Sequence, residues 1–128
     1  MEKLQTLFSA LSDKSRLGII AALWESNDMC ACQIVELLQL SGATISKHLS
    51  ILMQAGLLDS YKEGRWVHYR LDFSNHCCDQ VMAWLEEQLY QTDIVKDDQL
   101  ALNEIMSADR EDICRKQRGD KCCPAKEQ

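Results

Sequence analysis

The sequence of 128 residues lacks a long hydrophobic run, and this absence argues against a membrane-spanning helix. Its longest apolar stretch, LGIIAALW (residues 17–24), is less than half of the roughly 20 residues that a bilayer requires. The N-terminus, MEKLQTLFSALSDK, also lacks the apolar core and the cleavage pattern of a secretory signal peptide. We therefore expect a cytoplasmic protein with no membrane partner.

The chain is also short of positive charge, with 14 Lys and Arg against 20 Asp and Glu and a net charge of −6. Such a balance argues against a nonspecific coat on nucleic acid. Residues 41–70 nevertheless carry four basic and two acidic residues, a local charge of +2 that leaves −8 for the remainder. A small basic region on an acidic body predicts a protein that contacts phosphates with one face only.

Seven cysteines are present, but no two of them have the C-x-x-C spacing of thiol oxidoreductases. In a reducing cytoplasm, an odd number of thiols favours metal binding or redox sensing over a disulfide scaffold. We therefore expect a binding protein and not an enzyme.

Hydrophobic spacing predicts a mainly α-helical fold with one β-hairpin. The expected helices cover residues 1–11, 14–25, 31–38 and 43–54. Ser12 or Asp13 can cap the second helix, and Gly56 ends the fourth. The alternating segment LLDSYKEGRWVHYRL (57–71) predicts a hairpin with its turn at residues 63–65. Helical spacing then returns in a stripe formed by Cys78, Val81, Met82, Leu85 and Leu89.

This order of elements is typical of a winged helix-turn-helix, in which the hairpin forms the wing. We expect residues 1–92 to form a DNA-binding and dimerisation domain. Residues 93–108 are expected to form a C-terminal helical extension, and residues 109–128 a mobile, cysteine-containing tail.

The helix over residues 43–54 has the pattern of an element that reads DNA. Ile45, Leu49 and Leu52 share one face and are expected in the core. The DNA-facing candidates on this helix are Thr44, Ser46, Lys47 and Ser50. In the wing, Lys62 and Arg65 flank the turn and can reach phosphates or a minor groove. His48 lies at the edge of the apolar face, where a structural hydrogen bond and a phosphate contact are both open.

Three segments, ALSDKSRLGIIAAL, SGATISKHLSILMQAGLL and EGRWVHYRL, together resemble the ArsR/SmtB family of bacterial metal-responsive repressors. The resemblance covers residues 3 to about 90. It implies a homodimeric repressor that leaves its double-stranded operator DNA when an inducer binds. It also implies a dimer interface made by the first helix and the helix that starts near Asn75. The apolar stripe of that last helix suits an interface, because a lone helix must bury such a face.

Cys30 and Cys32 stand at the start of the third predicted helix. The arsenic-responsive branch of the family carries C-x-C-x-x-C at this place, whereas the third position here is Val35. The resemblance implies that trivalent arsenic or antimony is the inducer and binds these thiolates, with no cofactor required. Side chains two apart on an ideal helix point about 200° apart. Chelation by this pair would therefore require an unwound helix start, or would unwind it.

The source of a third thiolate stays open between several cysteines. The candidates are Cys77, Cys78, Cys114, Cys122 and Cys123. The tail pair is attractive because a mobile segment can swing to a site, and Cys77 because it points off the apolar stripe. Cys78 lies in that stripe, which favours a core role.

Other functions remain as alternatives. The chain can instead be a repressor that senses cadmium, lead or zinc through four of its thiolates. It can also be a repressor that senses a thiol-redox signal. The zinc site common in the family is disfavoured, because Ser74 and Tyr90 occupy two of its four ligand positions beside His76 and Glu87. A redox pair is disfavoured because residues 17–24 hold no cysteine. A winged-helix module without DNA binding is the last alternative, and an operator-binding assay separates it from the repressors.

Overall fold

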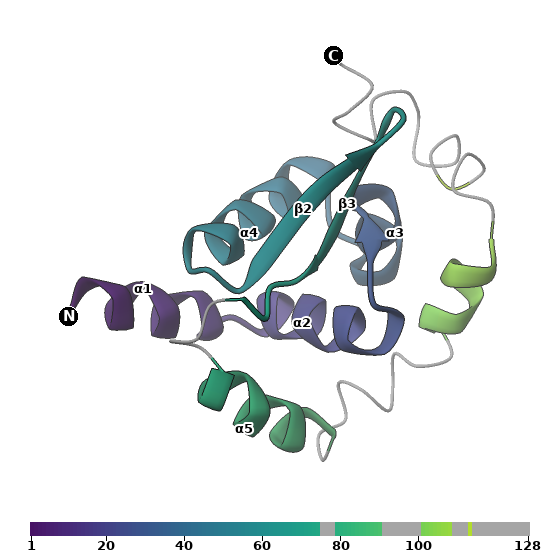
Figure 1. Cartoon of the computed structure of the whole chain (residues 1–128). Helices are drawn as coiled ribbons and strands as arrows, with labels where there is room; N and C mark the ends of the chain where they lie inside the picture. The colour runs from purple at the N-terminus through teal and green to yellow at the C-terminus, as the bar shows by residue number, and fades with distance from the viewer. Residues whose placement is uncertain (75–78, 91–100, 109–112, 114–128) are drawn as a thin grey trace.

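The computed structural model describes residues 1–74, 79–90, 101–108 and 113. Its elements follow the order α1 (Glu2–Leu11), α2 (Lys14–Ser26), β1 (Met29–Cys30), α3 (Ala31–Leu38), α4 (Gly42–Gln54), β2 (Leu58–Glu63), β3 (Trp66–Leu71) and α5 (Asp79–Tyr90) (Figure 1). Residues 101–107 form a further helical segment. Among the described helices, none combines the length and apolarity needed to cross a membrane.

The first four predicted helices and the hairpin are confirmed, with helix ends that differ from prediction by at most one residue. Asp13, not Ser12, caps α2, because its carboxylate accepts hydrogen bonds from the N–H groups of Ser15 (2.9 Å) and Arg16 (3.2 Å). Gly56 follows the last residues of α4 with a φ of 80°, a left-handed conformation that ends the helix. The fold is a winged helix-turn-helix.

The Asp13 cap gives a first prediction. Asp13→Ala should lower the free energy of unfolding by about 1 kcal/mol at neutral pH, as expected for loss of an N-cap. Burial acts to raise the pKa of Asp13, but hydrogen bonds from the Arg16 and Ser15 amides and the Arg16 charge outweigh it and leave the pKa below its ordinary value. The charged cap therefore contributes fully above the unfolded pKa of about 4, and this contribution is lost as the pH falls through the lower folded-state pKa.

Urea unfolding of wild type, Asp13→Ala and Asp13→Asn at several pH values measures the contribution of the Asp13 cap. Asp13→Asn keeps a side-chain acceptor, so it should retain most of the stability at neutral pH and lose the carboxylate's acid dependence. The wild-type advantage over Asp13→Ala should shrink in acid. An advantage of the same size at every pH would contradict a role for the charged carboxylate.

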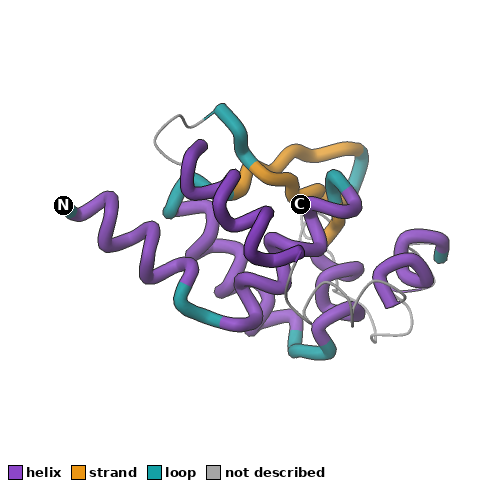
Figure 2. The backbone as a smooth tube through the Cα atoms, turned by 90° about the horizontal axis from the view of Figure 1, so that it is seen from below, coloured by secondary structure: helices purple, strands orange, loops and turns teal. Residues whose placement is uncertain are grey.

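A third strand, β1, was not predicted. It pairs antiparallel with β3, with Met29 opposite Tyr69 and Cys30 opposite His68, and the strand order in the sheet is β1-β3-β2. The strands lie on one side of a helical body (Figure 2). A strand of two residues is too short to show any periodicity in the sequence. Its presence places Cys30 at the junction between the sheet and α3.

The apolar stripe of α5 is buried within its own chain. Met82, Leu85 and Leu89 belong to the main core cluster together with α2 residues such as Ile19 and Ile20. Met82, Leu85 and Leu89 are therefore not available to a partner chain, which corrects the expectation that they face a dimer interface, whereas Val81 is only partly buried. Cys78 lies outside the described residues, as do parts of the predicted extension and most of the predicted tail.

Candidate nucleic-acid interface and thiol site

The outward face of α4 carries the four side chains predicted to read DNA. The Ser41 side chain caps this helix by accepting a hydrogen bond from the Thr44 N–H at 3.1 Å. Ile45, Leu49 and Leu52 are buried, and this fixes the rotation of the helix on the core. The four residues predicted to face DNA, Thr44, Ser46, Lys47 and Ser50, are all exposed. Lys47 and Ser50 lie opposite the buried face of α4, and Thr44 and Ser46 lie on its two flanks.

Arg16 links α4 to the end of α1. Its Nε donates a hydrogen bond to the Ala10 carbonyl at 2.8 Å, and its Nη2 donates one to the Ser9 carbonyl at 3.1 Å. The third guanidinium nitrogen of Arg16, Nη1, lies 3.2 Å from Nδ1 of the half-buried His48 in α4. This contact supports the structural role for His48. Sequence reasoning missed Arg16, because a single cation near a helix start gives no periodic signal.

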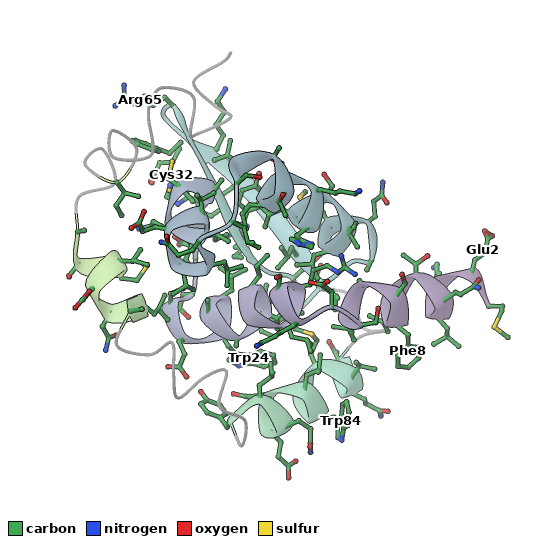
Figure 3. The ribbon with its side chains drawn as sticks, turned by 180° about the vertical axis from the view of Figure 1, so that it is seen from behind. Glu2, Phe8, Trp24, Cys32, Arg65 and Trp84 are labelled. Carbon is green, nitrogen blue, oxygen red and sulfur yellow. The ribbon has the colours of Figure 1, made fainter. Side chains whose placement is uncertain are left out.

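The tip of the β2–β3 hairpin carries the two predicted wing cations, Lys62 and Arg65. Both are exposed, and Gly64 between them has a φ of 64°, which the tight turn needs. The guanidinium carbon of Arg65 lies 5.2 Å from the centre of the Trp66 ring. Figure 3 shows Arg65 at the tip, away from the helical body. The wing therefore adds two cations to the one, Lys47, that is exposed on α4.

A polar network joins the wing to the segment before β1. Buried His68 places Nδ1 3.3 Å from an Asp28 carboxylate oxygen and Nε2 3.5 Å from a Glu63 carboxylate oxygen. Tyr61 stacks on His68 with ring centres 5.0 Å apart and donates a hydrogen bond of 2.9 Å to Asp28. That hydrogen bond raises the pKa of Tyr61. Asp28, two residues before Cys30, thus contacts Tyr61 and His68 of the wing.

Cys30 and Cys32 are fully buried, with 0% exposure. Cys30 is the N-cap of α3, with extended φ and ψ of −87° and 165°, and Cys32 lies inside the first turn. The Gln33 side-chain oxygen accepts a hydrogen bond from the Cys30 N–H at 2.9 Å. Cys30 is therefore already outside the helix. The expectation that chelation needs an unwound helix start is corrected, because the 200° separation applies only when both residues are helical.

The two thiols belong to a small apolar cluster separate from the main core. Ile105 and Ile113 are its other buried members, and the half-buried Leu37 and Trp66 pack against it. The members of this cluster carry no charged side chain. Within the part of the chain that the structure describes, no three or more His, Cys, Asp or Glu residues form a group able to hold a metal ion. Sequence reasoning missed Ile105 and Ile113 as neighbours of the thiols.

Cys77, Cys78, Cys114, Cys122 and Cys123 lie outside the described residues, as does His76. Of the thiols predicted to bind the inducer, the described residues therefore include Cys30 and Cys32 alone.

Large apolar side chains are exposed on α1 and α5. Leu4 and Phe8 on α1 are 54% and 58% exposed, and Trp84 on α5 is 59% exposed. Phe8 and Trp84 project outward from their helices (Figure 3), and both helices lie at the side of the molecule away from the wing tip (Figure 1). These three residues, named here the α1–α5 patch, differ from the buried stripe of α5. Large exposed apolar side chains of this kind are typical of interaction surfaces.

Comparisons with known proteins give related regulators. The family model described as bacterial regulatory protein, arsR family, matches residues 13–60. The chain is 46% identical over 65 residues to the arsenical resistance operon repressor of Escherichia coli (strain K12). This alignment covers 51% of this chain and 56% of that protein. It is 32% identical over 72 residues to the Bacillus subtilis (strain 168) protein of the same name. This alignment covers 56% of this chain and 69% of that protein.

A cadmium-related protein also matches. The cadmium resistance transcriptional regulatory protein CadC of Listeria innocua is 42% identical over 62 residues, 48% of this chain and 52% of that protein. The alignments to the E. coli repressor and to CadC thus span little more than half the length of each relative.

Among solved structures, HlyU from Vibrio cholerae N16961 matches with a TM-score of 0.59 and 29% identity. The match covers 71% of this chain and 95% of HlyU. It includes the same winged helix-turn-helix arrangement. With the sequence relatives, all of which are named as regulators, it shows that this chain belongs to the ArsR family of bacterial regulatory proteins, which are transcriptional regulators and not enzymes.

Proposed function

We propose that this chain is a homodimeric repressor that binds double-stranded operator DNA and is released by trivalent arsenic or antimony. The inducer binds the thiolates of Cys30 and Cys32, and no cofactor is required. The observation that carries this proposal is the position of the two buried thiols at the start of α3, the helix that packs against the reading helix α4. Similarity to arsenical resistance repressors supports the choice of inducer.

The DNA-binding part of the proposal depends on two exposed surfaces. The outward face of α4 places short polar side chains and Lys47 where a major groove can receive them. Lys62 and Arg65 at the wing tip contact the phosphate backbone beside it. In a twofold dimer the two reading helices lie about 34 Å apart, so the operator is an imperfect palindrome with half-sites one helical turn apart.

The inducer-response part depends on how Cys30 is held. Its backbone pairs with His68 of β3 and caps α3, so it contacts both the wing strand and the helix before α4. We infer that an ion bound to its sulfur displaces the apolar side chains that pack in the same cluster. The resulting shift at the start of α3 lowers the affinity for DNA. A coupling free energy of about 1–3 kcal/mol is ordinary for such a switch.

The surroundings of the thiols favour arsenite over a divalent cation. Arsenite is an uncharged hydroxide at neutral pH, whereas a hydrated cadmium ion must lose its water shell to enter an apolar cluster, which is costly. Similarity to CadC makes cadmium the second candidate, and lead, zinc and a thiol-redox signal remain further alternatives. Titration of the operator complex with arsenite and with Cd²⁺ tests the choice. Release by arsenite at the lower concentration is expected, and release by Cd²⁺ alone would establish the alternative.

The reading face gives a further prediction. Lys47→Ala should weaken operator binding and reduce the slope of log affinity against log salt by about one unit, as expected for the loss of one phosphate contact. Lys47→Arg keeps the cation and should retain the slope, and Lys3→Ala removes an equal charge from α1 and should leave it unchanged. Fluorescence anisotropy with labelled operator over a range of salt measures this slope. A Lys47→Ala variant with the wild-type slope would remove Lys47 from the interface.

A further inference from the structure

We propose that Trp66 carries the inducer signal to the wing, because its ring contacts both the Arg65 guanidinium and the apolar cluster around the thiols. The members of that cluster, named here the thiol cluster, are Cys30, Cys32, Ile105 and Ile113. This inference rests on the proposed function and specifies how the same site regulates DNA binding. Trp66 is a positioning residue, since it binds neither the inducer nor DNA and acts through Arg65.

The strand β3 brings the Trp66 ring into contact with both the wing tip and the thiol cluster. Trp66 is the first residue of β3 and pairs with Glu63 across the turn, so Arg65 directly precedes it. The guanidinium carbon of Arg65 lies 5.2 Å from the ring centre, within the range of a cation–π contact. Two residues further along β3, His68 pairs with Cys30. The half-buried ring packs against the thiol cluster on this side of the sheet.

Among the described side chains around the thiols, that of Trp66 is the one that is partly exposed and lies outside the main core. Ile105 and Ile113 are buried. The half-buried Leu37 packs against the main core as well as against the thiol cluster, whereas Trp66 packs against the thiol cluster only. A group added to a close-packed cluster displaces the neighbour that is least enclosed. The Trp66 ring is therefore the side chain that shifts.

Arsenite adds volume to the thiol cluster without any redox step. When As(OH)₃ reacts with the thiols of Cys30 and Cys32, two As–O bonds break and two As–S bonds form. Each thiol proton leaves with one hydroxide as water. The arsenic atom and its remaining ligand occupy more space than the two protons did, and both cysteines are 0% exposed. A neighbouring side chain must move, because a protein interior leaves few voids of that size.

Movement of the ring removes the contact that positions Arg65. The side chain of Arg65 is exposed, so the face of the Trp66 ring is what selects its rotamer near the DNA. Loss of a cation–π contact at an exposed site corresponds to a factor of about two to five in an equilibrium constant. Arg65 then leaves its phosphate, and this loss adds to the effect of the shift at the start of α3. A lost phosphate contact is measurable as a weaker salt dependence of operator binding.

Operator affinity measured over a range of salt, with and without sodium arsenite, tests this route in the full-length protein. In the wild type, arsenite should reduce the slope of log affinity against log salt by up to about one unit for each wing. Trp66→Leu keeps an apolar side chain but has no aromatic face. Its affinity without arsenite should be about two- to fivefold lower, and arsenite should leave its slope unchanged.

Two further variants separate a role through Arg65 from a merely structural one. Lys62→Ala is the matched control, because it removes the other wing cation. It should lower the slope without arsenite and retain the arsenite-dependent change. In an Arg65→Gln background, Trp66→Leu should have little further effect on affinity, since the two residues then act as one unit.

The emission of the Trp66 indole gives a second measurement. The chain has three tryptophans, so the contribution of Trp66 is assigned by comparison with Trp66→Phe, which keeps an aromatic ring and a folded wing. Sodium arsenite should change the emission of the wild type and of Trp24→Phe, and this change should be absent in Trp66→Phe. Trp24 is the matched control because it is also half-buried but packs against the main core.

The outcomes separate this inference from the proposed function. Release of the wild type by arsenite with no change in Trp66 emission would overturn the inference and leave the repressor proposal in place. A folded Trp66→Leu variant that keeps the wild-type change in slope would do the same, as would loss of that change in Lys62→Ala. A wild-type protein that binds no arsenite, and stays on its operator when arsenite is added, would overturn the proposed function itself.

Discussion

A Cys30→Ser, Cys32→Ser double variant is expected to hold its operator at arsenite concentrations that release the wild type. Its affinity for DNA without inducer should stay close to that of the wild type. Serine is a favourable N-cap, so Cys30→Ser preserves the start of α3. Because the sulfur ligands are gone, the inducer-dependent loss of affinity, about 5- to 150-fold for an ordinary switch, should disappear.

Fluorescence anisotropy with labelled operator and titrated arsenite measures this effect. Cys32 is fully buried, and a buried hydroxyl without a good partner costs about 1–3 kcal/mol. Cys30→Ser, Cys32→Ala avoids that cost and serves as the matched variant. Both should fail to respond to arsenite. Release of either variant at wild-type arsenite concentrations would move the inducer site to another part of the chain.

Trp84→Glu is expected to convert the protein into monomers that bind the operator far more weakly. Trp84 belongs to the α1–α5 patch, with Leu4 and Phe8. In a twofold interface each substitution occurs twice, so two carboxylates would be removed from water, at a cost of several kcal/mol. Loss of the dimer also removes one reading helix, and the remaining half-site contacts cannot sustain specific binding.

Analytical ultracentrifugation and circular dichroism together test this prediction. Trp84→Phe keeps a large apolar side chain and should remain dimeric. Leu85→Glu gives an informative contrast, because Leu85 is only 6% exposed and packs in the core of its own chain. That variant should lose helical structure instead of forming a folded monomer. A folded Trp84→Glu protein that stays dimeric would place the interface outside the α1–α5 patch.

The helices and the hairpin could be predicted because each is long enough to show its own period. Leu4, Leu7 and Leu11 have helical spacing, and Val67, Tyr69 and Leu71 alternate as in a strand. Strand β1 could not be found this way, since two residues have no period. The apolar stripe of α5 correctly predicted which side of this helix is buried, but not which surface covers that side. Sequence spacing cannot distinguish a partner chain from α2.

The exposed side of α4 was predictable for a related reason. Ser41 marks the helix start, and Ile45, Leu49 and Leu52 fix its rotation, so the opposite face follows. Contacts between distant segments were not predictable. The hydrogen bonds of Arg16 to the end of α1 and the packing of Ile105 and Ile113 on the thiols depend on how the elements meet in three dimensions. No local sequence pattern predicts such contacts between distant segments.

The backbone role of Cys30 has an evolutionary consequence. Its pairing with β3 and the hydrogen bond from its N–H to Gln33 involve main-chain atoms of this residue. Serine at this position is close to cysteine in size and would cap α3 at least as well as cysteine does. The side chain at position 30 can therefore be exchanged while the DNA-binding scaffold is conserved. A lineage with this fold can acquire or discard a soft-ion response by point mutation, without redesigning the protein that binds the operator.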